Sequence, residues 1–146
     1  METSKRIAMH PWWIFTRYAP HLGKRVSYAM ALLMGGQPKS LQRNINGNNC
    51  GLCDTFEWDN VIHILFRCPA LNIPRKEAWE KLMKVMPPGM AMSLQTMNVR
   101  EKSKFLLSGL GDRYIPEWQG VYGATIQYIC VLYELRAKLY DEDVNG

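Results

Sequence analysis

Long hydrophobic runs are missing from this sequence of 146 residues. Its longest apolar stretches, such as Ala29–Met34, are far shorter than the roughly 20 residues that a helix needs to cross a bilayer. The N-terminal stretch also lacks the apolar core and the small-residue cleavage site of a secretory signal. We therefore expect an intracellular protein, nuclear or cytoplasmic, that has no membrane as a partner.

Acidic residues are scarce in the first third of the chain. Residues 1–50 hold seven Lys and Arg against one acid, a net charge of +6, whereas residues 51–146 hold eleven against twelve and complete the total of +5. A basic first third favours a polyanionic partner, either nucleic acid or an anionic membrane surface. Solubility alone explains the charge equally well, because the basic residues are dispersed and form no block.

Alternating β-branched runs, internal repeats and low-complexity tracts are also absent. Apolar residues make up 47% and charged residues 21% of the chain, which excludes wholesale disorder. Helical spacing of apolar residues and Pro or Gly boundaries predict a mainly α protein. The expected helices cover residues 3–18 (interrupted near Pro11), 20–34, 57–66, 74–86, 99–107 and 116–140. Trp12, Trp13 and Phe15 are expected to be buried, and the acidic tail 141–143 is expected to fray.

Cysteines number only four, and three of them lie within nineteen residues together with a histidine. The spacing is Cys50-x2-Cys53-x9-His63-x4-Cys68. Thiolates and imidazole are the ligands of tetrahedral zinc, and Gly51 relieves crowding in the turn between the first two sulfurs. Four protein ligands leave no position for a reactive water, so we expect one structural Zn²⁺ ion.

Two other interpretations of these cysteines were considered. They can be reduced core residues beside an ordinary helical histidine, but four ligand-type residues at workable spacing rarely coincide. A redox pair at Cys50 and Cys53 is less favoured, since no strand precedes it to form the context of such motifs. Cys130, the fourth cysteine, is expected to be a small buried apolar residue.

The predicted organisation is one domain with three segments. Residues 1–45 form a basic helical N-terminal segment, residues 46–75 the zinc-binding segment, and residues 76–146 helices that pack in the same domain. The fold class is thus a small, mainly α domain with an inserted Cys-Cys-His-Cys zinc loop.

The zinc segment resembles that of non-LTR (LINE-type) retrotransposon reverse transcriptases, near the C-terminus of the polyprotein. The resemblance lies in Cys50-Gly-Leu-Cys53, Glu57, His63-Ile-Leu-Phe-Arg-Cys68-Pro69 and Arg75, with weaker similarity around Trp12-Trp13, 102–110 and 122–136. A retroviral zinc knuckle differs, because its gap from cysteine to histidine is much shorter. The resemblance implies an accessory module that binds the element's RNA or its target DNA during target-primed reverse transcription.

Basic and aromatic side chains supply candidate contacts to nucleic acid. Trp12, Trp13 or Tyr18 can stack on unpaired bases, although burial is the more favoured role for the two tryptophans. The candidate phosphate contacts are Lys5, Arg6, Arg17, Lys24, Arg25, Lys39, Arg43, Arg67 and Arg75.

Two of these candidates flank the zinc ligands. Arg67 and Arg75 can clamp a phosphate, or they can pair with Glu57 or Asp59 at the surface.

Catalytic patterns are missing. The paired aspartates of a two-metal polymerase, the carboxylate cluster of an endonuclease and a Ser-His-Asp arrangement cannot be found in the sequence. We therefore expect no enzyme. The alternative to nucleic-acid binding is a zinc-stabilised protein–protein interaction domain. It would dock the polymerase body, or serve a host protein derived from the element, through a surface such as the Met-rich stretch 90–97.

Overall fold

The computed structural model describes residues 10–33, 50–53, 55, 61–111 and 114–145, and throughout these residues it contains helices and no strand. The predicted mainly α fold is confirmed. The α-helices are α1 (Pro11–Phe15), α2 (Gly23–Leu33), α3 (Asn72–Val85), α4 (Pro88–Thr96), α5 (Val99–Leu107) and α6 (Gln119–Asn145). Short helical turns are η2 (Pro20–Leu22), η4 (His63–Arg67), η5 (Pro69–Leu71) and η6 (Pro116–Trp118).

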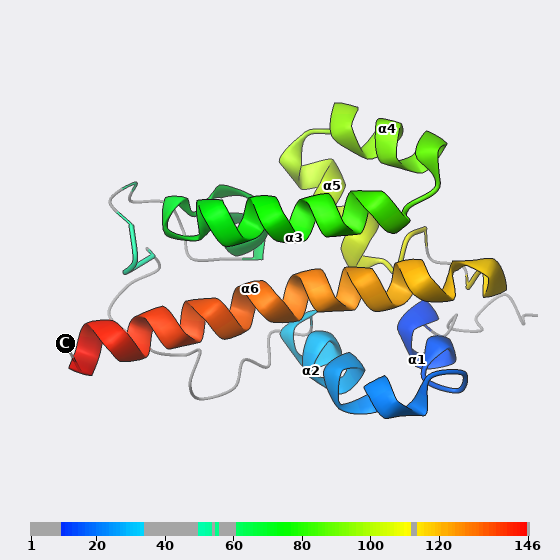
Figure 1. The fold of residues 1–146 in the computed structure, drawn as a ribbon, viewed down its shortest axis with the longest axis horizontal. Helices are drawn as coiled ribbons and strands as arrows, with labels where there is room; N and C mark the ends of the chain where they lie inside the picture. The colour runs from blue at the N-terminus through cyan, green and yellow to red at the C-terminus, as the bar shows by residue number, and fades with distance from the viewer. Residues whose placement is uncertain (1–9, 34–49, 54, 56–60, 112–113, 146) are drawn as a thin grey trace, which may run out of the picture.

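Helix α6 is the central element of the fold. Helix α3 runs antiparallel along one side of it, and α1 and α2 cover the other side (Figure 1). Tyr128 of α6 packs against Trp79 of α3, with ring centroids 5.6 Å apart, while Cys130 donates a hydrogen bond of 3.7 Å to the Arg25 carbonyl of α2. The sequence pattern indicated one apolar face on this helix. The structure buries two, because α6 is covered from both sides.

The short helix α1 anchors the start of the described chain. Trp12 and Phe15 are fully buried, as predicted, and the Phe15 ring lies 5.9 Å from that of Tyr122. The prediction was wrong for Trp13, which is 38% exposed. Only one of two adjacent side chains can point inward from a helix this short, and Trp12 occupies the inward position.

Helix α5 has the bounds that the sequence predicts, residues 99–107. Asn98 caps its N-terminus: its side chain accepts a hydrogen bond from the Glu101 amide, and the Glu101 carboxylate accepts one from the Asn98 amide. At its C-terminus Gly109 adopts a positive φ of 83°, and the Leu110 amide donates to the Phe105 carbonyl at 3.0 Å.

Several predicted boundaries differ from the structure. Helix α4 was not predicted, because Pro87-Pro88-Gly89 was interpreted only as a stop, whereas Pro88 also opens the next helix. The acidic tail is helical as far as Asn145, so the expected fraying at 141–143 was wrong. The N-terminal helix ends at Phe15, and residues 3–9, like the predicted helix start at 57–60, lie outside the described residues.

None of the helices in the described part of the chain combines the length and the apolar character needed to cross a membrane.

Candidate metal centre

Four side chains from one short stretch of the chain bring their ligand atoms together. The sulfurs of Cys50, Cys53 and Cys68 and a ring nitrogen of His63 all lie within 4.8 Å of one another. The two sulfurs of Cys50 and Cys68 are 3.8 Å apart, and the Cys53 sulfur lies 3.4 Å from His63 Nε2. A tetrahedral zinc ion with ordinary bond lengths has edges of about 3.8 Å between sulfurs and about 3.6 Å between sulfur and nitrogen. The cluster therefore matches the dimensions of a metal site.

A wide helical turn positions the second pair of ligands. His63 opens the π-helix η4, and the Cys68 amide donates to the His63 carbonyl at 2.7 Å, five residues back along the chain. A π turn is wider than an α turn and is often found at functional sites. It carries the chain from His63 to Cys68 so that both side chains reach the sulfurs of Cys50 and Cys53. The spacing predicted one turn between these ligands but not its π geometry.

Backbone amides support two of the sulfurs in the same way. The Leu52 amide donates to the Cys50 sulfur at 3.4 Å, and the Ala70 amide hydrogen-bonds the Cys68 sulfur. In each case the donor lies two residues after the cysteine. Such bonds favour the thiolate, which is the form that binds a metal.

Without a metal, the neighbouring thiols work against this ionisation. The hydrogen bond between the Cys68 thiol and the Cys50 sulfur, together with burial, raises the pKa of Cys68 far above its ordinary value, although the Ala70 amide opposes the shift. A divalent cation held by the three sulfurs and the imidazole would offset the repulsion between the thiolates and favour their deprotonated form.

The centre is shielded from solvent. Cys50, His63 and Cys68 are at most 6% exposed, and Cys53 is half-buried with its sulfur 3.1 Å from the Thr55 hydroxyl. The described cysteines are free thiols rather than disulfides. A buried set of four protein ligands is typical of structural rather than catalytic metal sites.

Two side chains tie the ligand turn to the rest of the fold. The Tyr128 hydroxyl of α6 donates to the Leu65 carbonyl at 2.6 Å. Arg75 of α3 donates from Nη2 to the Cys68 carbonyl at 2.7 Å and to the Ile64 carbonyl at 3.3 Å. These bonds connect the carbonyls of the ligand turn directly to helices α3 and α6.

The Arg75 side chain is therefore inside the protein and not at the surface, where a contact to phosphate was expected. Its side chain is only 9% exposed, burial lowers its pKa, and its third hydrogen bond goes to the Asn72 side chain at 2.9 Å. The alternative pairing with Glu57 or Asp59 falls on residues outside the described part of the chain. Arg75 instead holds the segment that carries Cys68.

The other basic candidates are not gathered at one place. Arg17 and Lys24 are exposed and Arg25 is half-buried, on the α1 and α2 side of α6, whereas Arg67 is exposed on η4, on the α3 side (Figure 1). Lys5, Arg6, Lys39 and Arg43 lie outside the described residues. Tyr18 is 60% exposed and stacks on Tyr114, with ring centroids 5.7 Å apart.

Beside the metal centre lies an aromatic and basic pocket that the sequence analysis missed. It has a volume of about 230 Å³, and its walls come from η4, α3, α5 and α6. Its α3 residues are Asn72, Arg75, Lys76 and Trp79, which follow the i, i+3, i+4, i+7 pattern of one helix face. That pattern is visible in the sequence and could have indicated the site.

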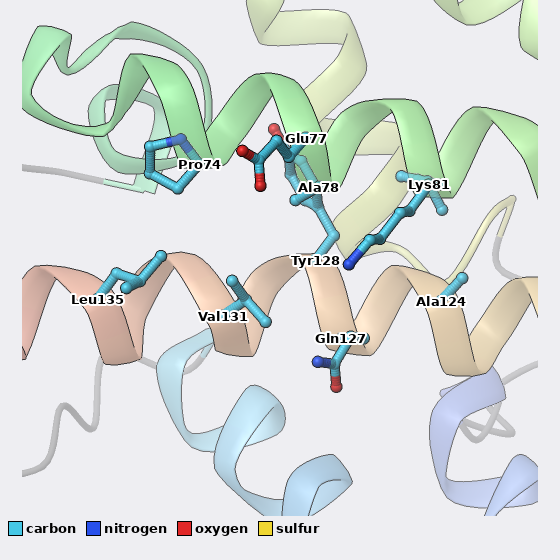
Figure 2. Close-up of a pocket in the computed structure, with 10 residues that line it drawn as sticks. Pro74, Glu77, Ala78, Lys81, Ala124, Gln127, Tyr128, Val131 and Leu135 are labelled. Carbon is cyan, nitrogen blue, oxygen red and sulfur yellow. The ribbon is translucent and has the colours of Figure 1, made fainter.

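A second, more apolar groove of about 180 Å³ separates α3 from α6. Figure 2 shows Pro74 and Ala78 of α3 facing Val131 and Leu135 of α6 across it.

Comparison of the chain with protein-family models, curated proteins and solved structures finds no match. The resemblance to retrotransposon proteins therefore depends on the residues quoted above.

Proposed function

We propose that this chain is a non-catalytic nucleic-acid-binding module built on one structural zinc ion. In this proposal it acts in the nucleus as an accessory C-terminal part of a retroelement reverse transcriptase during target-primed reverse transcription. The observation that carries it is the ligand cluster itself. Cys50, Cys53, His63 and Cys68 have the order and spacing of the retrotransposon motif, and their ligand atoms gather within 4.8 Å.

Zinc is the metal that best fits this donor set. Three thiolates and one imidazole in a tetrahedron favour zinc over magnesium, calcium or manganese, which prefer oxygen ligands. Because all four positions would be filled by the protein, the metal would shape the fold and would activate no water.

Charge near the centre supports a polyanionic partner. Arg67 is exposed on the turn between two metal ligands, and Lys76 is exposed on the neighbouring helix. Arg17 and Lys24 present further positive charge on the other side of α6. Contacts between such side chains and phosphates release counterions, so binding would weaken steeply with salt.

The test is fluorescence anisotropy of a labelled structured RNA and a labelled duplex DNA against zinc-loaded protein at several salt concentrations. We expect log Kd to rise linearly with log salt concentration, with a slope that counts the phosphate contacts. Neutralising Arg17, Lys24 and Arg25 together should weaken binding across all sequences. Absence of binding to either probe at low salt would contradict the proposal.

The α3–α6 groove favours a second candidate, a zinc-stabilised protein–protein interaction domain. Its apolar walls and its rim residues Glu77 and Lys81 suit a partner side chain flanked by charges (Figure 2). This candidate predicts no nucleic-acid affinity and self-association or partner capture through the groove. Size-exclusion chromatography with light scattering separates the two candidates cheaply.

A further inference from the structure

The aromatic and basic pocket beside the metal centre offers hydrogen-bond donors around a flat ring surface. Phe66 meets the Trp79 ring edge-on at 5.8 Å, and Tyr128 meets it edge-on at 5.6 Å. These two contacts fix the indole in place, so its remaining surface is a preorganised platform for a planar group.

The face of Trp79 already receives a group from another helix. The Lys102 ammonium of α5 lies 5.4 Å from the centroid of the Trp79 ring. A cation–π contact of this kind shows that the ring face is accessible and electron-rich. A stacking ligand can take the place of the ammonium, which is then free to contact a charge on the same ligand.

The polar groups of the pocket are donors. Asn72 uses its amide oxygen to accept from Arg75 Nη1, which leaves its NH₂ group to donate. Arg75 is more than nine-tenths buried and forms part of the pocket wall, where its guanidinium adds positive charge. Lys76 and Lys102 add two ammonium groups, and no Asp or Glu is found among the described residues that line the pocket.

We propose that this pocket binds one unpaired nucleotide of a single-stranded or looped nucleic acid. The base stacks on Trp79, its acceptor atoms meet the Asn72 amide, and its phosphate meets Lys76 and Lys102. This inference rests on the proposed nucleic-acid-binding function and locates one contact to nucleic acid at this pocket.

Size and chemistry together select this ligand. The volume of about 230 Å³ is below the roughly 300–1,000 Å³ of pockets for drug-sized ligands, so it suits one planar group. A nucleotide supplies a π face, base-edge acceptors and an anion within one residue of the chain. A base inside a duplex keeps its own stacking partners, so only an unpaired base can enter.

Anisotropy with a fluorescein-labelled oligouridylate and with the same strand in a duplex tests the proposal. Lys76→Ala/Lys102→Ala should weaken single-strand binding at least tenfold and leave duplex binding within threefold. The matched control is Lys84→Ala/Lys104→Ala, which removes the same charge from the same two helices outside the pocket and should change single-strand binding less than twofold. Equal losses in the two double variants would overturn the pocket assignment.

A second measurement isolates stacking from charge. An abasic strand of the same length keeps its phosphates, so wild-type protein should bind it at least fivefold more weakly than the oligouridylate. Trp79→Leu should bind both strands equally, with zinc content and circular dichroism unchanged. If Trp79→Leu still prefers strands with bases, the stacking role is wrong.

Different results would contradict the nucleic-acid-binding function and the assignment of this pocket. Wild-type protein that binds no oligonucleotide at low salt would overturn the nucleic-acid function and this pocket with it. Wild-type binding that Lys76→Ala/Lys102→Ala does not weaken beyond the control would overturn the pocket alone.

Discussion

Tyr128, on the central helix, donates its hydroxyl hydrogen bond to the Leu65 carbonyl, which lies between the candidate metal ligands His63 and Cys68 in the chain. The two residues are 63 positions apart in sequence. Through this bond the helix that organises the core also fixes the turn that presents two of the four ligands. Core stability and metal geometry are therefore coupled.

Removing this hydroxyl should destabilise the protein. In Tyr128→Phe the buried Leu65 carbonyl loses its side-chain donor, which costs about 1–3 kcal/mol of unfolding free energy. Urea denaturation of the zinc-loaded protein measures the change. Tyr18→Phe is the control, because Tyr18 is 60% exposed and its substitution should stay within about 0.5 kcal/mol. Equal stability of Tyr128→Phe and wild type would show that the bond contributes nothing.

The metal centre should bind one zinc ion per chain and hold its segment folded. Native mass spectrometry should count one zinc in wild type and in Cys130→Ala, and none in Cys68→Ser. Complete chelation should unfold the region around residues 46–75 and lower the melting temperature, since structural zinc supplies folding free energy. Unchanged circular dichroism and melting after metal removal would contradict a structural role.

Cobalt provides a check on the ligand set. Co²⁺ bound by three thiolates and one imidazole in a tetrahedron gives intense visible bands, whereas a six-coordinate oxygen site is nearly colourless. The bands should shift to longer wavelength in His63→Cys without disappearing, because a fourth thiolate preserves the tetrahedron and has a weaker ligand field than imidazole. Their absence in wild-type protein would contradict the tetrahedral assignment.

Gly109 should not tolerate a side chain. Its φ of 83° is strained for other residues, and a Cβ there would lie 2.9 Å from two ring carbons of Pro11. Gly109→Ala should therefore lose about 1–3 kcal/mol of unfolding free energy. Gly120→Ala, in helix α6 with nothing within 4 Å of the added Cβ, should be neutral or slightly stabilising. Thermal unfolding of both variants checks the contrast, and similar melting temperatures would refute it.

Cys130 should react slowly and with a steep dependence on pH. Burial raises its pKa to about 11, so the thiolate fraction at pH 8 is about one thousandth, against about a quarter for a free cysteine. Since the thiolate is the nucleophile, alkylation should speed up about tenfold per pH unit from 8 to 10. Timed iodoacetamide labelling of the zinc-loaded protein, followed by peptide mass spectrometry, measures this rate. A rate independent of pH would show that local opening, and not ionisation, limits it.

Sequence patterns that involve only a few neighbouring residues correctly predicted local features of the structure. The ligand spacing around Cys50 identified the metal cluster, and the glycine that follows the predicted helix 99–107 marked the end of α5, because turns depend on a few adjacent residues. Cys130 was correctly expected to be buried.

Features that depend on tertiary packing could not be derived in the same way. Arg75 looks like a surface cation in the sequence, and only the folded ligand turn brings the carbonyls of Ile64 and Cys68 to its buried guanidinium. Trp13 was misplaced because the direction of α1 against α6 decides which of two adjacent tryptophans points inward. The second buried face of α6 likewise exists only because helices cover it from both sides.

The central position of α6 also constrains the order of assembly on the ribosome. Synthesis delivers α1, α2, the ligand turn and α3 before the helix against which all of them pack. Trp12, Leu65 and Leu82 are buried in the folded protein. Until α6 has emerged, these side chains stay exposed to water, and the nascent chain has only local structure. Cooperative folding of this domain therefore waits for the synthesis of α6, and a ribosome stalled before residue 119 would leave a chaperone substrate instead of a partly finished domain.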